Sequence, residues 1–343
     1  MSMSASLPAP VSNIGSPHRI STLPILVLFP HNRCNCRCVM CDIWRIRQVR
    51  EITVADLQPH VQSFLALHVR WVVFSGGEPQ LHTDLAGLAN LFRERGIRVT
   101  LLTAGLLLEA HARSITSVID DIIVSLDGPE EIHNQIRGVP RAFDLLARGV
   151  AAIRKARPRM MVSGRSTVQK ANFRYLRETV HTARRLGLNS ISFLAADLTS
   201  EAFNRPGGWP AGRQTAIALD WHEADALDQE VETLIREHAE DITSGYITES
   251  PQKLRRISLH FRAHLGQVPA AAPRCNAPWV SAVIEADGTV RPCFFQRPLG
   301  NIREESFFEI LNSRDAENFR RTLDIATDAI CRNCVCSLFL PPG

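Results

Sequence analysis

Six short runs of apolar residues recur along the chain before residue 195, and each is continuous rather than alternating with polar residues. A continuous run of this length is typical of a strand that is buried on both faces, as strands are in a parallel sheet. We therefore predict six buried strands, at residues 25–29, 70–74, 98–102, 122–126, 160–168 and 190–194.

Stretches with helical spacing of apolar residues lie between these strands, at residues 57–67, 84–94, 143–155 and 175–186. Strands that alternate with helices build right-handed βα units around a parallel sheet. The predicted fold is therefore α/β, wound as an open sheet or as a full or partial barrel. Six units are fewer than the eight of a closed barrel.

The chain divides into four predicted parts. They are a flexible Ser- and Pro-rich N-terminus (1–22), a βα region (23–196), a helical bridge (197–273) and a C-terminal module (274–343). The bridge has a Gly- and Pro-rich loop followed by two helical stretches, 221–241 and 251–265. In the C-terminal module, segments 280–285 and 289–291 flank Asp287-Gly288, which is a hairpin turn signal.

Charge and hydropathy argue against two classes of partner. The net charge of +4, from 39 Lys and Arg against 35 Asp and Glu, is too mild to indicate nucleic-acid binding. No apolar stretch reaches the ~20 residues of a membrane span, and residues 1–22 lack the pattern of a secretory signal. We therefore expect a cytoplasmic protein, in which clustered cysteines hold metal or carry out redox chemistry more often than they form disulfides.

Cys34, Cys38 and Cys41 stand in a C-x3-C-x2-C pattern directly after the first predicted strand. Three thiolates at this spacing can hold one iron–sulfur cluster and leave its fourth iron without a protein ligand. Such an iron can bind another molecule. Cys36 lies inside the motif, so a different ligand set is arithmetically possible, and structural zinc with a fourth ligand elsewhere is the alternative.

The sequence CNCRCVMCDIW, at residues 34–44, resembles the cluster-binding motif of the radical S-adenosylmethionine (SAM) superfamily, and the likeness extends over about residues 24–195. The resemblance implies a partial (β/α)6 barrel and a four-iron, four-sulfur (4Fe–4S) cluster on Cys34, Cys38 and Cys41. It also implies SAM, whose amino and carboxylate groups chelate the open iron. One departure is Met40, where the family commonly has an aromatic residue; its backbone and thioether can still contact adenine.

Three later strand ends resemble SAM-binding motifs of the family. Gly76-Gly77-Glu78 follows the second strand and resembles the motif that binds the amino group of the methionine moiety. Ser125 and Asp127 end the fourth strand, in the region that contacts ribose. Arg165 lies in the fifth strand, where a guanidinium needs an anionic partner, and by resemblance this partner is the methionine carboxylate. The alternatives are ordinary turns at the first two places and a structural salt bridge at Arg165.

Other segments have weaker indications. Thr103-Ala104-Gly105 resembles a turn of the family, but Ala replaces its usual polar residue, so we assign it no ligand contact. Phe193 and Leu194 can frame adenine or belong to the core. Four bridge residues are unranked candidates for substrate contacts: Asp197, Glu201, Arg205 and Trp209.

The C-terminal module carries five more cysteines, Cys275, Cys293, Cys331, Cys334 and Cys336. Their pattern resembles the twitch module, the shortened form of the SPASM extension, in which four cysteines hold one auxiliary 4Fe–4S cluster. The resemblance implies Cys275, Cys293, Cys331 and Cys334 as ligands, with Cys336 as a bystander or a substitute. Structural zinc is the alternative, because the spacing is also that of a zinc ribbon.

Together these motifs imply a radical SAM enzyme. The expected reaction is reductive cleavage of SAM to a 5′-deoxyadenosyl radical that abstracts hydrogen from a substrate, with oxidation or dehydrogenation of a small molecule as the outcome. The electron would come from a donor such as flavodoxin or ferredoxin. Two alternatives stay open: modification of a ribosomally made peptide, and a non-catalytic iron–sulfur or zinc protein that acts in redox sensing or assembly.

Overall fold

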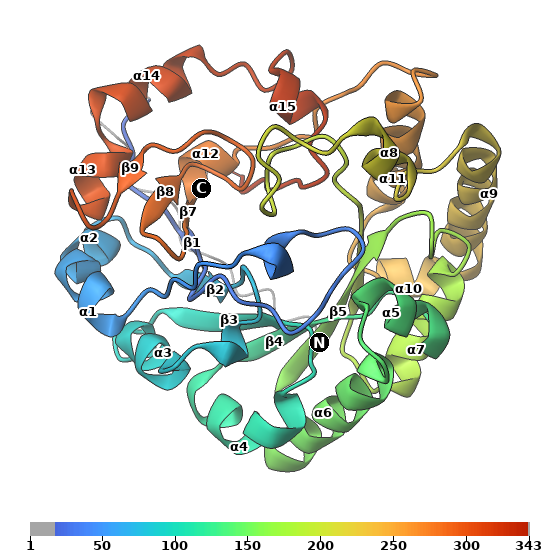
Figure 1. Cartoon of the computed structure of the whole chain (residues 1–343), viewed down its shortest axis with the longest axis horizontal. Coiled ribbons are helices and arrows are strands. Elements are labelled where there is room, and N and C mark those ends of the chain that lie inside the picture. The colour runs from blue at the N-terminus through green and yellow to red at the C-terminus, as the bar shows by residue number, and fades with distance from the viewer. Residues whose placement is uncertain (1–17, 342–343) are drawn as a thin grey trace.

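The six predicted strands form one parallel sheet, in which they follow one another in sequence order (Figure 1). The computed structural model describes residues 18–341. Each strand begins and ends within one residue of its predicted bounds. The observed bounds are β1 (Ile25–Leu28), β2 (Trp71–Phe74), β3 (Arg98–Thr103), β4 (Asp121–Ser125), β5 (Met161–Val168) and β6 (Ile191–Ala195).

The predicted C-terminal hairpin is also present, and it extends the main sheet. Strand β7 (Ser281–Ile284) pairs in parallel with β1, with Val283 opposite Val27. Strands β8 (Thr289–Arg291) and β9 (Gly300–Asn301) follow in antiparallel pairing. All four residues of β7 are buried, so the hairpin covers the edge that β1 would otherwise expose.

The sheet is not closed into a barrel. Within residues 18–341 its nine strands run in the order β6-β5-β4-β3-β2-β1-β7-β8-β9, and the end strands β6 and β9 do not pair. The predicted α/β class and partial barrel are therefore confirmed.

The predicted helices are present, and two of them are interrupted. The stretch 57–67 is divided into α1 (Val54–Leu57), the 3-10 turn η2 (Gln58–His60) and α2 (Val61–Ala66), because Pro59 has no N–H to donate. The stretch 221–241 is divided at His238 into α9 and α10. The remaining bounds are α3 (Leu85–Arg93), α6 (Ala142–Ala156), α7 (Leu176–Arg185), α9 (Trp221–Glu237), α10 (Ala239–Thr243) and α11 (Pro251–His264). The short helix α8 (Ala211–Thr215), at the end of the Gly- and Pro-rich loop, was not predicted.

Two helices of the βα units were not predicted, α4 (Leu108–Val118) and α5 (Glu130–Arg137). In α5 the buried residues are His133, Ile136 and Arg137, so polar side chains occupy most of the buried face. Apolar spacing therefore cannot reveal this helix.

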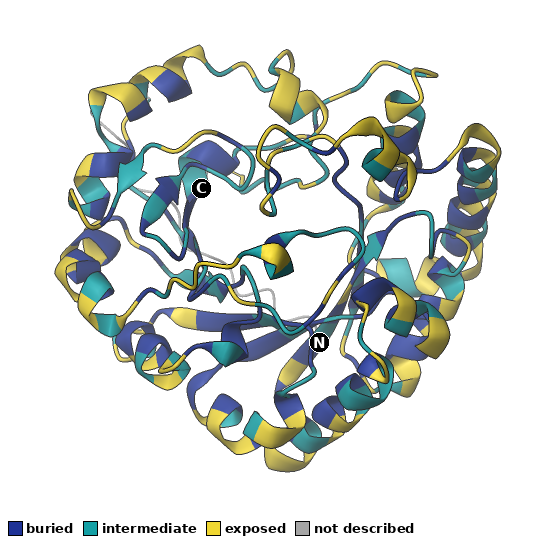
Figure 2. Cartoon of the chain, viewed as in Figure 1, coloured by how far each residue is buried: buried dark blue, intermediate teal, exposed yellow. Residues whose placement is uncertain are grey.

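The helices of the βα units cover the outer face of the sheet, while the loop after β1 and the loop before α8 lie over its inner face (Figure 1). The sides of these helices that face the sheet are buried, and the opposite sides are exposed (Figure 2). One apolar core fills the space between sheet and helices. The inner face is thus left to loops and polar side chains.

The C-terminal helices connect the end of the chain to its beginning. They are α12 (Ala277–Val280), α13 (Phe307–Leu311), α14 (Arg314–Thr322) and α15 (Ala329–Arg332). The amide of Asn312 bonds both the backbone N–H and the carbonyl of Ile20, at 2.7 and 3.0 Å. Residues 1–17 of the predicted flexible N-terminus lie outside the described residues. No helix within residues 18–341 is long and apolar enough to cross a membrane.

Replacing Phe307 by Ala should lower the free energy of unfolding by about 3–5 kcal/mol. The Phe307 side chain of α13 is fully buried, and its ring centroid lies 5.2 Å from that of Phe64 in α2. Urea unfolding followed by circular dichroism measures the loss. Leu259→Ala is the control, because that side chain is 49% exposed and should cost less than about 0.5 kcal/mol. Equal losses in the two variants would contradict the tight packing of α13 on the βα region.

Candidate functional site

The loop after β1, residues 29–42, carries the first four cysteines, and we call it the cysteine loop. The turn after β2 holds one side of it. The N–H of Glu78 donates to the carbonyl of Arg33 at 2.8 Å. A Cβ at Gly77 would lie 1.9 Å from that same carbonyl oxygen, and Gly76 has a φ of +94°. The two glycines are therefore needed for the close approach of the loop to β2.

Helix α5 holds the opposite side of the cysteine loop. The N–H groups of Arg37 and Val39 donate to the carbonyls of Arg137 and Ile136, at 2.9 and 3.0 Å. These carbonyls belong to the last turn of α5, where no helical N–H is available to them. Gly138 ends the helix in the left-handed conformation, with φ of +62°, and a Cβ there would lie 2.5 Å from the carbonyl oxygen of Arg37.

The bridge holds the loop from a third direction. The guanidinium of Arg205 forms a buried ion pair with Asp197 at 2.7 Å and donates to the carbonyl of Met40. The indole N–H of Trp209 donates to Asp42, directly after Cys41. Three of the candidates for substrate contacts therefore support the cysteine loop: Asp197, Arg205 and Trp209. The sequence could not indicate this role, because the contacts of Arg205 and Trp209 with the loop span more than 160 residues.

The thiols of the cysteine loop converge. The thiol of Cys36 interacts with those of both Cys34 and Cys38, and these hydrogen bonds raise the pKa of Cys36. Cys36 and Cys38 are buried, and Cys34 and Cys41 are half-buried. Burial raises the pKa of Cys41 to about 12. The charges of Cys34 and Cys38 also act on Cys41, so the four thiols are neighbours. Within residues 18–341, however, no group of three such residues is arranged to hold a metal.

A buried ion pair lies next to Cys38. The guanidinium of Arg137 is 2.6 Å from the Asp127 carboxylate and 3.6 Å from Cys38 Sγ. Burial alone would lower the pKa of Arg137, but Asp127 raises it above its ordinary value. The hydrogen bond with Cys36 and the charge of Arg137 together lower the pKa of Cys38 to about 7, against the effect of burial. Sequence reasoning missed Arg137 because only the fold places it beside a cysteine 99 residues away.

Asp127 is fully buried and already has protein partners. One carboxylate oxygen accepts from the Thr167 N–H at 3.0 Å, and the other faces Arg137. Its own N–H donates to His133 Nδ1 at 3.3 Å. Burial lowers the pKa of His133 to about 4, so this ring is neutral near pH 7 and can accept that bond.

Glu78 is bound by the turn after β3. Its carboxylate accepts from the hydroxyl of Thr103 and from the N–H of Ala104, both at 2.8 Å. Burial raises the pKa of Glu78, although these hydrogen bonds oppose the shift. The Thr103-Ala104-Gly105 turn, to which we assigned no ligand contact, thus fixes Glu78 beneath the cysteine loop.

Ser125 and Arg165 are neighbours on the inner face of the sheet, since they are opposite each other in the pairing of β4 with β5. The guanidinium of Arg165 donates to the hydroxyl of Ser192 at 3.3 Å. Within residues 18–341 it forms no ion pair, so the structural salt bridge that was the alternative for Arg165 is absent from the described chain. A guanidinium on this face is available to an anionic ligand.

The cysteines of the second set influence one another electrostatically, but no three of them are arranged to hold a metal in the described chain. Cys275 precedes α12, Cys293 follows β8, and Cys331, Cys334 and Cys336 lie in or after α15. The charges of Cys336, Cys293 and Cys275 raise the pKa of Cys334 in addition to the effect of burial. Cys331 Sγ accepts from the Gln296 amide at 3.5 Å, and its charge couples to Cys293.

The raised pKa values of these thiols suit metal ligands better than free reactive thiolates. Burial raises the pKa of Cys293 and raises that of Cys331 to about 12. Without metal they are protonated near pH 7, and a bound metal centre would displace the protons and stabilise the thiolates. Five thiols from separate segments exceed the four that one cluster needs.

Two protein families match the chain. The Radical SAM superfamily matches residues 28–183, and SPASM, described as an iron–sulfur cluster-binding domain, matches residues 275–335. The second match favours an iron–sulfur cluster over zinc at the C-terminal cysteines.

Three individual proteins share similarity over most of the chain. The AdoMet-dependent heme synthase of Methanosarcina barkeri is 26% identical over 297 residues, which cover 85% of this chain and 82% of that protein. The structure of anSMEcpe with bound AdoMet has a TM-score of 0.64 at 20% identity and covers 90% of this chain and 88% of its own. Streptococcus suis SuiB bound to S-adenosylmethionine has a TM-score of 0.63 at 16% identity, with coverage of 93% and 73%. The two structures share the fold.

Replacing Arg137 by Met should raise the pKa of Cys38, because the nearby positive charge favours the thiolate. The thiolate fraction near pH 7 then falls, and alkylation of Cys38 by iodoacetamide slows. The measurement is the pH profile of alkylation in metal-free protein, read by peptide mass spectrometry. Arg137→Lys keeps the charge and should keep the profile close to that of wild type. Coincident profiles for the wild type and Arg137→Met would contradict the account.

Proposed function

We propose a function from the premise that this chain is a radical SAM protein with a C-terminal SPASM domain. It is an enzyme that cleaves SAM reductively and abstracts a hydrogen atom from a small organic substrate, which it oxidises. The observation that carries the proposal is the position of the cysteine loop over the inner face of the open sheet, in which Ser125 and Arg165 are opposite each other (Figure 1).

Cys34, Cys38 and Cys41 hold the first 4Fe–4S cluster in this proposal, and Cys36 remains a neighbour that is not a ligand. When bound, the cluster would pass an electron from a donor such as flavodoxin or ferredoxin to SAM and so supply the reductive cleavage that leads to hydrogen abstraction from the substrate. Arg137 offsets the negative charge at Cys38. The cysteine loop and the bridge exclude water from this centre.

The SAM site is assigned to residues around the cysteine loop. Gly76, Gly77 and Glu78 form the turn for the methionine amino group, with the Glu78 carboxylate held in place by Thr103 and Ala104. Ser125 binds ribose, and Arg165 binds the methionine carboxylate. Asp127 acts on the site through Arg137, whose guanidinium lies 2.6 Å from its carboxylate.

Cys275, Cys293, Cys331 and Cys334 hold the auxiliary 4Fe–4S cluster, with Cys336 as the spare thiol. A cluster held there would supply an acceptor for the second electron of a two-electron oxidation of the substrate. This assignment is supported by the SPASM match over residues 275–335.

A small-molecule substrate is favoured over a peptide. The similarity to a protein named as a heme synthase spans 85% of this chain and 82% of that protein. The structure of SuiB bound to its precursor peptide SuiA is only 17% identical to this chain, so the similarity indicates a shared fold and does not extend to the substrate.

The test is anaerobic incubation of the cluster-loaded protein with SAM and dithionite, followed by chromatography for 5′-deoxyadenosine. The wild type should form it, and Cys38→Ala should lose at least about a hundredfold in rate, because a cluster held by two thiolates is not retained.

Cys36→Ala is the matched control and should still cleave SAM, because Cys36 is not a ligand in this proposal. Two outcomes would refute the proposal: an inactive wild type that contains both clusters and is given a second reductant, or equal activity in Cys38→Ala.

A further inference from the structure

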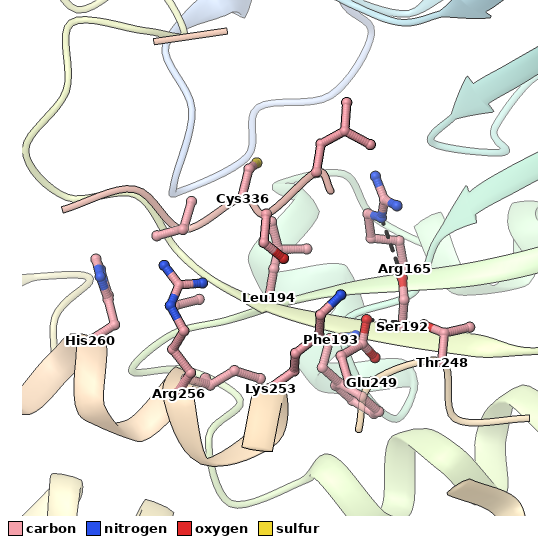
Figure 3. Close-up of a pocket in the computed structure, with 15 residues that line it drawn as sticks. Arg165, Ser192, Phe193, Leu194, Thr248, Glu249, Lys253, Arg256, His260 and Cys336 are labelled. Atoms are coloured by element: carbon pink, nitrogen blue, oxygen red, sulfur yellow. Dashed lines mark hydrogen bonds between the residues drawn. The ribbon is translucent and has the colours of Figure 1, made fainter. Parts of the chain in front are cut away.

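A cavity of about 390 Å³ lies between the sheet, α11 and the C-terminal segment, and we call it the basic pocket. Arg165 and Ser192 line it from β5 and β6, Lys253 and Arg256 from α11, and Cys336 from the chain end (Figure 3). Its size is within the range of sites for small organic molecules. Leu194, Ile257 and Val335 supply apolar wall, so the pocket suits a ligand that has both hydrocarbon and polar parts.

Three cationic side chains face this pocket. Lys253 and Arg256 are three residues apart on α11 and so share one face of the helix. Lys253 extends into the middle of the pocket, between Arg256 on one side and Arg165 on the other (Figure 3). Within residues 18–341, none of the three forms an ion pair with a carboxylate.

The single carboxylate that lines the pocket does not neutralise these cations. The Glu249 carboxylate accepts from the Phe193 N–H and from the Thr248 hydroxyl, both at 2.9 Å. The pocket therefore carries an excess of positive charge, with three cations against one carboxylate. A partly enclosed cavity with charge of one sign attracts ligands of the opposite sign.

Two of the three cations in the pocket have an assigned partner, and the third does not. Arg165 is assigned to the methionine carboxylate of SAM. Arg256 donates to the carbonyl of Cys334, so it lies beside the proposed auxiliary cluster. Lys253 is one helical turn before Arg256, and its amine has no hydrogen-bond partner or ion pair within the described chain. Lys253 is exposed, so its amine is hydrated and free to pair with an anion that enters the pocket.

We infer that the basic pocket binds the anionic group, a carboxylate or a phosphate, of the organic substrate, with Lys253 and Arg256 as its partners. The inference rests on the proposed function and narrows its substrate class to organic acids. The pocket is bordered by Arg165, which is opposite Ser125, and by Cys336, two residues after Cys334. The substrate would thus lie between the SAM site and the second set of cysteines.

The test is calorimetric titration of the anaerobic, cluster-loaded protein with SAM already bound, so that Arg165 is occupied. The probes are hexanoate, pentyl phosphate and the uncharged hexanamide, which separate carboxylate from phosphate and charge from shape. Hexanoate or pentyl phosphate should bind at least tenfold more tightly than hexanamide. Lys253→Met and Arg256→Met should each weaken that binding about tenfold or more, since a charge-assisted hydrogen bond is worth about 1.5–3 kcal/mol.

Arg255→Met is the matched control. Arg255 lies on the same helix but pairs with Glu232 outside the pocket, so the same loss of charge should leave probe binding unchanged. Iron content, measured for every variant, checks that Arg256→Met retains both clusters, and Lys253→Met repeats the test away from Cys334.

Three results would overturn the inference. The first is that hexanamide binds as tightly as both anions, and the second is that no probe binds detectably at millimolar concentration. The third is that Lys253→Met and Arg255→Met lose equal amounts of probe binding. Release of 5′-deoxyadenosine from the same wild-type sample is measured in parallel. If it is formed while probe binding fails, the pocket inference alone is wrong; if it is not formed, the proposed function is wrong.

Discussion

The close approach between the cysteine loop and the turn after β2 is the constraint on which the site depends. The Arg33 carbonyl occupies the space that a side chain at residue 77 would need, and the same carbonyl accepts the N–H of Glu78 at 2.8 Å. A loop displaced by even one methyl group would lose this hydrogen bond and shift the four thiols that follow. Gly76 and Gly77 are therefore required first for the close packing of the cysteine loop on the turn after β2, and only second as part of a cofactor site.

The loop is held from three directions by parts of the chain that are distant in sequence. The turn after β2, the end of α5 and the bridge residues Arg205 and Trp209 each contact it. Charged groups from distant segments also meet at the loop, because Asp127 pairs with Arg137 and Arg137 lies beside Cys38. The bridge also contributes α11, whose Lys253 and Arg256 line the basic pocket. One segment thus supports the cysteine loop and shapes the space beside it.

The sequence predicted those features that local pattern encodes. Continuous apolar runs located six of the seven strands that pair in parallel within the described chain, and cysteine spacing located both groups of thiols. It did not predict α5, because His133 and Arg137 give that helix a polar buried face. Nor could it predict that β7 pairs with β1, or that Glu78 is held by Thr103 and Ala104, since these contacts depend on how distant segments meet. The unpaired state of Lys253 is likewise a property of the folded arrangement.

The account centres on an iron of the first cluster that is free to bind SAM directly. The most direct measurement is the electron paramagnetic resonance spectrum of the dithionite-reduced, cluster-loaded protein before and after SAM is added. The account predicts that SAM shifts the g values of one cluster, the one that Cys38→Ala removes, and leaves the signal of the other unchanged. A spectrum in which SAM alters neither signal would contradict it.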